Sequence, residues 1–200
     1  SLGTLPAHGT RVMTFKVQVP TVTQDTAWTN VATVTSPNTP DTPPSEEVKV
    51  ESPVPQLLIE KLHRVGAESE FTKDLLHVER DGVVTYQLVV THDPADPKPA
   101  DAKGLHVTDV VPTAPSGAPY GYVSDSLWGA VVDGAGATVE GRAVSVAYDG
   151  ESRTVSCDAD LLLPGEKLII SFDVCVPAVR EYTRWTNVGY LSYDNNPEGP

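Results

Sequence analysis

Short runs of alternating apolar and polar residues fill most of the chain, and turn-forming residues separate them. In residues 11–19 the apolar side chains Val12, Phe15, Val17 and Val19 recur at near-regular intervals, which predicts a strand with one buried face. Glycine and proline together number 33 and lie between such runs. No segment sustains the i, i+3, i+4, i+7 spacing of a helix. The pattern therefore predicts an all-β protein, an Ig-like antiparallel β-sandwich.

Several further strands follow from the same pattern. Asp81-Gly82 is a strong turn signal and predicts a hairpin on either side of it. The region 115–141 is rich in glycine, alanine and aromatic residues, and we expect irregular structure there with one or two short strands. The remaining predicted strands cover residues 27–35, 48–50, 57–62, 75–78, 83–91, 105–112, 144–148, 154–157, 167–176 and 183–193.

The chain repeats itself. Trp28-Thr29-Asn30-Val31 recurs as Trp185-Thr186-Asn187-Val188, and ten of the seventeen positions from 15 to 31 are identical in 172 to 188. A fixed offset of this kind is typical of a tandem repeat array. We therefore expect residues 1–54 to be the C-terminal part of a preceding unit plus a linker. Residues 55–200 are then a second, nearly complete sandwich.

The charge balance excludes some function classes. A formal net charge of −13 and a pI near 4.6 argue against binding to nucleic acid, because phosphates need a basic surface. No apolar run approaches the roughly 20 residues of a membrane-spanning helix.

Three polar residues interrupt runs that are predicted to be buried: Lys61, Asp109 and Asn187. First and last strands of a sandwich are commonly neighbours, so we expect Lys61 and Asn187 to face each other across one ladder. Burial lowers the pKa of a lysine and raises that of a carboxyl group. A neutral amine is a nucleophile, and a protonated Asp109 would polarise the Asn187 carbonyl as the amine attacks. Ammonia would leave, and an amide would join Lys61 to Asn187.

Each residue of this trio also has an ordinary structural interpretation. Lys61 would be a solvent-facing lysine on an edge strand, held by Glu60 or Glu181. Asp109 would cap the turn before the next proline. Asn187 would be a buried amide satisfied by backbone groups.

Five segments of the second unit occur in an order similar to that of a known family. They are 58–61 (Leu-Ile-Glu-Lys), 83–91 (Val-Val-Thr-Tyr-Gln-Leu-Val-Val-Thr), 107–112 (Val-Thr-Asp-Val-Val-Pro), 163–166 (Leu-Pro-Gly-Glu) and 185–189 (Trp-Thr-Asn-Val-Gly). In this order the chain resembles the conserved-repeat, isopeptide-forming domains of bacterial surface adhesins and fimbrial proteins, which are relatives of the Cna-type sandwich.

The resemblance implies roles for individual residues. Lys61 would be the isopeptide donor, Asp109 the catalytic acid, Asn187 the acceptor, and Asn30 the acceptor of the preceding unit. The protein would be a stalk or spacer repeat of an extracellular, cell-wall-associated adhesin, with neighbouring repeats of the same polypeptide as its partners. It would be no enzyme beyond a single-turnover reaction on itself.

A second function class stays open. A module that binds a host protein such as collagen, or a glycan, would use region 115–141, with Tyr120, Tyr122 and Trp128 as an exposed apolar contact. An extracellular hydrolase is a third class, but no nucleophile-elbow motif surrounds any serine.

The cysteines and histidines add little chemistry. Cys157 and Cys175 lie on strands joined through one bend, and both a disulfide and two buried thiols fit that arrangement. The histidines match no compact zinc spacing, and the acidic loops 93–101 and 194–198 lack the spacing of a calcium loop. We therefore expect no metal and no cofactor.

Overall fold

A computed structural model of the chain describes residues 6, 8–18, 26–32, 45–50, 54–66, 69–97, 99–113, 120–178, 184 and 186–196. The chain divides into two units, Ser1–Ser52 and Pro53–Pro200. The repeat in the sequence predicted a boundary after residue 54.

The described residues of the N-terminal unit form one antiparallel pair, β1 (Thr26–Val31) and β2 (Ser45–Val50), with Thr26 opposite Val50. The strand predicted at 11–19 is wrong over its described part, because residues 11–18 form no strand. Phe15 and Val17 are 60% and 71% exposed there. No described strand pairs with this segment, so its apolar side chains have no opposing layer to pack against.

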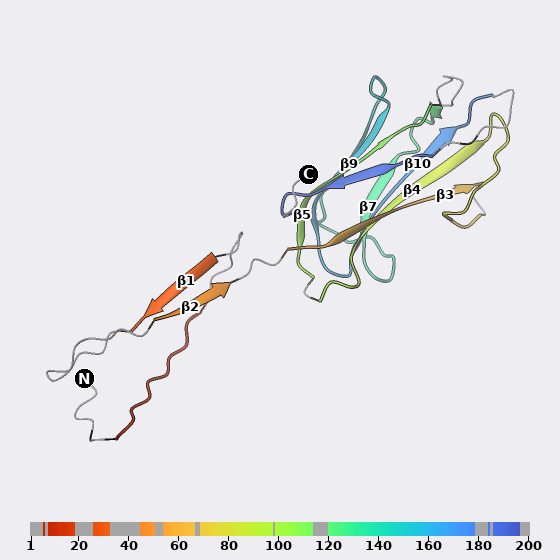
Figure 1. Cartoon of the computed structure of the whole chain (residues 1–200). Helices are drawn as coiled ribbons and strands as arrows, with labels where there is room; N and C mark the ends of the chain where they lie inside the picture. Colours follow the sequence, from red (N-terminus) through yellow and green to blue (C-terminus); the bar gives the residue numbers. More distant parts are fainter. Residues whose placement is uncertain are drawn as a thin grey trace. The chain divides into compact units, whose positions relative to one another are not determined.

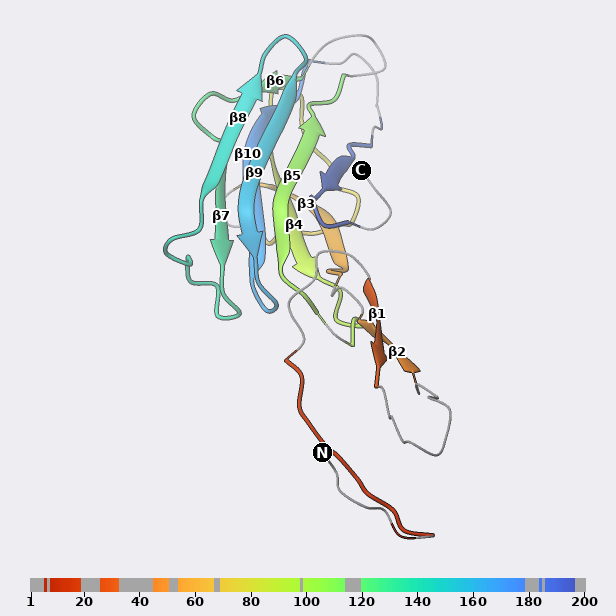
Figure 2. The ribbon, with the colours of Figure 1, turned by 90° about the vertical axis from the view of Figure 1, so that its left-hand side faces the viewer.

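The C-terminal unit is a sandwich of two antiparallel sheets, as the alternating pattern predicted (Figure 1). One sheet has the order β3-β4-β10-β6, with β7 also paired to β10, and the other has the order β11-β5-β9-β8. Figure 2 shows β8, β9 and β5 lying over β7, β10 and β4. The strands are β3 (Leu57–Val65), β4 (Val83–His92), β5 (Ala102–Val110), β6 (Gly121–Tyr122), β7 (Trp128–Val132), β8 (Val144–Asp149), β9 (Thr154–Leu162), β10 (Lys167–Cys175) and β11 (Gly189–Ser192).

Alternate residues of the central strands build the core between the two sheets. Successive side chains of a strand point to opposite faces, so every second residue of β4 and β10 faces β5 and β9. Fully or almost fully buried members of this core are Val84, Tyr86, Leu88, Val90, Leu105, Val107, Val155, Leu168, Ile170, Phe172 and Val174. This core fixes the two sheets face to face.

Glycines allow the two sheets to approach each other at both margins of the sandwich. A Cβ on Gly129 of β7 would lie 2.7 Å from Val146 Cγ1 on β8, and a Cβ on Gly189 of β11 would lie 2.2 Å from Leu88 Cδ2 on β4. Any larger residue would collide there. β7 therefore packs closely against β8 at one margin, and β11 packs over the opposite sheet at the other.

The predicted hairpin around Asp81-Gly82 is wrong, because residues 75–78 form no strand. β4 is already paired on one side with β3 and on the other with β10, so no free edge remains for a further strand. The turn itself is present, since the Gly82 backbone amide donates to the Glu79 carbonyl at 3.0 Å. Residues 120–141, the described part of region 115–141, contain the two short strands β6 and β7, within the number expected.

Candidate functional site

Lys61 lies at the centre of β3 and faces the interior of the sandwich. The strand alternation that turns Leu57, Ile59 and Val65 toward the core also turns Lys61 inward, and its side chain is only 14% exposed. Its Nζ lies 4.7 Å from the centroid of the Tyr86 ring and 5.8 Å from that of Phe172. Two aromatic rings therefore form the wall beside this amine.

Asp109 lies opposite Lys61, on β5 of the other sheet. It follows Leu105 and Val107 on the buried face of that strand and is 0% exposed. Among the described residues, no other charged side chain is classed as fully buried. A carboxyl group in such a place needs a partner, since burying it unpaired is costly.

The two groups are partners of each other. Lys61 Nζ donates a hydrogen bond to Asp109 Oδ2 and forms an ion pair with it across the gap between the sheets. Burial lowers the pKa of Lys61 to about 8, although the Asp109 carboxyl opposes this shift. Burial also raises the pKa of Asp109, against the opposing effect of the Lys61 amine. Both shifts favour moving one proton from the amine to the carboxyl group, which leaves a neutral pair.

Asn187 approaches the same carboxyl group from the segment leading into β11. Its amide lowers the pKa of Asp109, which places the two side chains near each other. Within the described part of the chain, however, Asn187 Nδ2 and Asp109 Oδ1 are buried and make no contact of hydrogen-bond geometry. A buried amide nitrogen without a partner costs about 1–3 kcal/mol. The Asn187 amide therefore acts on the Asp109 carboxyl group without a contact of standard hydrogen-bond geometry.

Gly189 sets the position of Asn187 over the core. Gly189 is the register partner of Asp109, so both residues point to the same face of the β5–β11 pair. A Cβ at this position would lie 3.6 Å from Asp109 Oδ2 as well as in collision with Leu88. Because Gly189 has no side chain, β11 packs directly against Leu88. Asn187 lies two residues before Gly189 in the chain.

The structure brings the three predicted residues into one region, but not across one ladder. Lys61 belongs to β3 in the five-stranded sheet, and Asn187 leads into β11 in the four-stranded sheet. The expected ladder is therefore wrong. β3 and β11 are edge strands of different sheets that contact each other, and Lys61 and Asn187 each act on Asp109.

Asn30, the expected acceptor of the preceding unit, has different surroundings. It lies on β1 opposite Glu46 and is exposed. No buried site surrounds it within the described N-terminal residues, and its role stays a prediction. Trp185, which precedes Asn187 by two positions in the repeated motif, lies outside the described residues.

The disulfide between Cys157 and Cys175 does not form. Both thiols are free. Cys157 lies on β9 and is fully buried in the core. Cys175 lies on β10 of the other sheet. Its neighbours Val174 and Val176 are buried, so the Cys175 side chain points to the outer face of that sheet. Burial raises the pKa of the Cys157 thiol to about 12, as expected of a thiol that packs as a small apolar group.

The predicted aromatic contact surface is also wrong as a single patch. Tyr120 is only 3% exposed, because it belongs to the core. Tyr122 stacks on Tyr148 with ring centroids 3.9 Å apart and packs against the same core. Trp128 is 48% exposed and stays available on the outer face of β7.

The sequence analysis missed the aromatic wall of the site. Tyr86 and Phe172 lie opposite each other on β4 and β10, with ring centroids 5.7 Å apart, and both are buried. Their positions in the alternating pattern, on the same face as Leu88 and Ile170, were the available signal. The alternating pattern does not predict which strand covers the Tyr86 and Phe172 rings. The described residues contain no group of three or more His, Cys, Asp or Glu side chains that could hold a metal ion.

Comparisons with known proteins give similarity to solved structures only. No family model matches the chain, and no curated protein matches it. The major pilin SpaA of Corynebacterium diphtheriae, whose structure points to a modular pilus assembly with stabilising isopeptide bonds, is similar with a TM-score of 0.44 and 14% sequence identity. The match covers 73% of this chain and 38% of that pilin. No helix long and apolar enough to cross a membrane occurs among the described residues.

Proposed function

We propose that the C-terminal unit is a mechanical stalk or spacer module of a bacterial cell-surface protein, in which an amide bond forms between the side chains of Lys61 and Asn187. The observation that carries the proposal is the buried Lys61–Asp109 pair with the Asn187 amide beside it. A lysine and an aspartate in a core are costly to keep unless they are paired or have a task.

The reaction needs no group from outside the chain. Transfer of a proton from Lys61 to Asp109 gives a neutral amine, and both pKa shifts favour that state. Lys61 Nζ then attacks Asn187 Cγ, while the protonated Asp109 donates to the developing oxyanion or to the leaving nitrogen. The new C–N bond forms, the bond from Cγ to Nδ2 breaks, and Nδ2 leaves as ammonia. Asp109 gives its proton to Nδ2 and takes the proton that Nζ loses as the amide forms, so Asp109 ends protonated and one ammonia is lost from the chain.

The environment supports this direction of reaction. Asn187 Nδ2 is buried and makes no contact of standard hydrogen-bond geometry in the described part of the chain, and it is the atom that the reaction removes. The Lys61 amine and the Asn187 amide both act on the Asp109 carboxyl group, and proximity of this kind replaces an encounter in solution. The aromatic rings of Tyr86 and Phe172 keep the amine in apolar surroundings.

A bond at this place would have a mechanical consequence. β3 and β11 are the first and last strands of the C-terminal unit and the edge strands of different sheets. An amide between Lys61 and the residue two positions before β11 would connect the two ends of the unit covalently. Tension applied to the ends would then pass through a covalent bond instead of unzipping hydrogen-bonded strands.

The proposal also includes an extracellular location of the protein and a tandem arrangement of its repeats. They rest on the sequence resemblance and on the internal repeat, in which Phe15 corresponds to Phe172. Phe15 is 60% exposed, whereas Phe172 is fully buried. Among its described residues the N-terminal unit thus carries the sequence of a core strand with no layer over it, which fits a repeat whose partners are neighbouring repeats.

Intact-mass measurement of the purified chain under reducing conditions tests the proposal. We expect the wild-type chain to be lighter than its sequence by one ammonia, and Lys61→Ala and Asp109→Ala to have their full sequence masses. Lys103→Ala is the matched control, because Lys103 lies exposed on β5, and it should lose ammonia like the wild type. A wild-type chain at full mass would refute the bond.

A further inference from the structure

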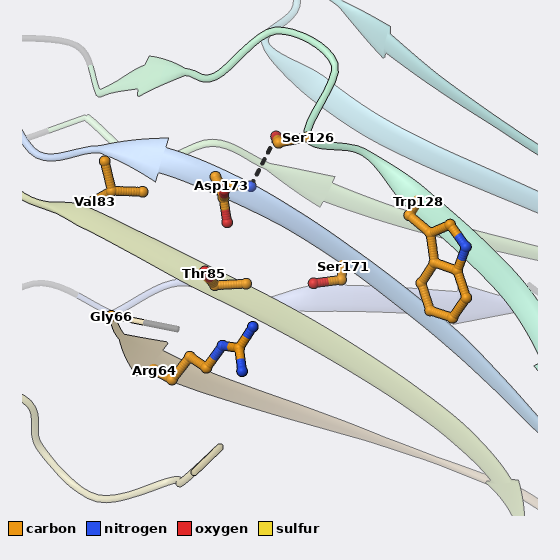
Figure 3. Close-up of a pocket in the computed structure, with 8 residues that line it drawn as sticks. All are labelled: Arg64, Gly66, Val83, Thr85, Ser126, Trp128, Ser171 and Asp173. Carbon is orange, nitrogen blue, oxygen red and sulfur yellow. Dashed lines mark hydrogen bonds between the residues drawn. The ribbon is translucent and has the colours of Figure 1, made fainter. Parts of the chain in front are cut away.

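An open groove lies on the outer face of the five-stranded sheet, on the side away from the Lys61 site. Its volume is about 500 Å³, within the roughly 300–1,000 Å³ of small-ligand sites. Side chains from four strands and one loop line it, and Figure 3 shows them pointing outward from the sheet. Those that matter here are Arg64, Thr85, Ser126, Trp128, Ser171 and Asp173.

The strand register arranges these side chains in two rows. Arg64 and Asp173 are both register partners of Thr85, so one row runs across β3, β4 and β10. Ser171 pairs with Trp128, which makes a second row across β10 and β7. Neighbouring strands are about 4.8 Å apart and the rows about 6.7 Å apart, a spacing on the scale of one sugar ring. The polar side chains of the groove therefore lie in two regular rows beside the Trp128 indole.

The sheet is interrupted where the groove lies. β10 pairs with β6 at Val174 and Cys175 and with β7 from Lys167 to Ser171, and a loop separates the two contacts. There Ser126 Oγ accepts a hydrogen bond from the Asp173 backbone amide at 2.9 Å (Figure 3) and donates one to the Val123 carbonyl at 2.6 Å. A side chain thus satisfies a backbone group that a continuous strand would have satisfied.

Trp128 and Arg64 are the two large side chains of the groove. Trp128 keeps 48% of its surface exposed, although its neighbour across the ladder is the polar Ser171. The Arg64 guanidinium lies 4.6 Å from the centroid of the Phe71 ring, which orients its planar group. Ser171 Oγ donates to the Tyr86 carbonyl at 3.2 Å, so its lone pairs face outward as acceptors. Donors, acceptors and an apolar plane are therefore present together.

We propose that this groove binds a neutral sugar residue of a glycan, with Trp128 as the stacking platform. A pyranose has an apolar C–H face that fits an indole, and hydroxyl groups at its rim that donate and accept. Asp173 and Ser171 accept from these hydroxyls, and Arg64 donates to them. The charges of Arg64 and Asp173 cancel, and a chain of net charge −13 repels anionic sugars, so the ligand is uncharged. The site is separate from the Lys61 site and does not depend on the amide bond.

The test is an NMR titration of the full chain that follows the Trp128 indole N–H resonance, assigned with Trp128→Phe. The probes are methyl α-mannoside, lactose, maltotriose and chitotriose, with an oligoproline peptide as the competing ligand class. We expect at least one saccharide to shift this resonance in a saturable manner. Trp128→Ala should weaken its binding about tenfold or more, as followed by calorimetry.

Two controls separate the proposal from its alternatives. Tyr190→Ala removes another exposed aromatic ring, on β11, and should leave binding unchanged. Lys61→Arg cannot form the amide and should bind the saccharide as the wild type does, so a failure of the proposed bond does not remove this site. If none of the four saccharides shifts the Trp128 resonance, or if only the oligoproline peptide does, the proposal is wrong.

Discussion

The amide bond should account for a large part of the stability of the C-terminal unit, and its size follows from the loop that it closes. The segment from Lys61 to Asn187 spans 126 residues (187 − 61). Cross-linking a loop of this length restricts the unfolded chain and is worth about 5 kcal/mol at 25 °C in the chain-entropy treatment. Lys61→Arg keeps a cation beside Asp109 but cannot form the amide. It should lower the free energy of unfolding by about this amount and the melting temperature by roughly 10–20 °C.

A double-mutant cycle distinguishes the bond from ordinary packing. Asn187→Ala removes the same bond from its other end, so each single variant should lose about 5 kcal/mol, and the double variant should lose little more. Urea unfolding followed by circular dichroism gives the three values, and Lys103→Arg on the exposed face of β5 is the matched lysine control. Additive losses in the double variant, or a Lys61→Arg chain as stable as the wild type, would refute the reasoning.

Three further predictions concern the same site. Asp109→Asn removes the proton carrier, so refolded chain should lose ammonia about 10²–10⁴-fold more slowly in time-resolved mass spectrometry; an unchanged rate would exclude an acid–base role. In the unlinked Asn187→Ala chain the folded-state pKa of Lys61, about 8, lies below its unfolded value of 10.5, so the unfolded state binds the extra proton between these values. Its stability should therefore rise from pH 8 to pH 10.5, and this rise should be absent when Lys61→Met is added; equal pH profiles would contradict the assigned shift. Gly189→Ala places a Cβ 2.2 Å from a core methyl group and should cost about 1–3 kcal/mol and reduce the yield of bonded chain, whereas Gly150→Ala, with its nearest contact at 3.9 Å, should do neither.

The alternating pattern was sufficient to predict the fold class and most strands of the C-terminal unit. Runs such as 83–91 and 167–176 carry β-branched and aromatic residues at every second position, and they became β4 and β10 within a residue or two. The pattern could not say which strands become neighbours. The 75–78 hairpin failed for this reason, since both edges of β4 were taken by β3 and β10.

The polar interruptions of buried runs were the useful signal for the site. Lys61 and Asp109 stood out because charged residues rarely occupy core positions, and the structure joins them by a direct contact between the sheets. The aromatic wall and the close packing of Gly189 on Leu88 were not predictable, because both depend on how the sheets face each other. The internal repeat also shows that burial was not predictable from local sequence. Phe15 and Phe172 share their local sequence, yet burial depends on strands that lie elsewhere in the chain.

Peptide mapping by tandem mass spectrometry locates the bond between Lys61 and Asn187 directly. The chain, purified under reducing conditions, is digested and searched for the peptide that contains Lys61 and the peptide that contains Asn187. The account predicts one branched species that holds both peptides, lighter than their sum by one ammonia, with fragment ions that locate the branch at these two residues. Recovery of the two peptides separately, each at its full mass, would contradict it.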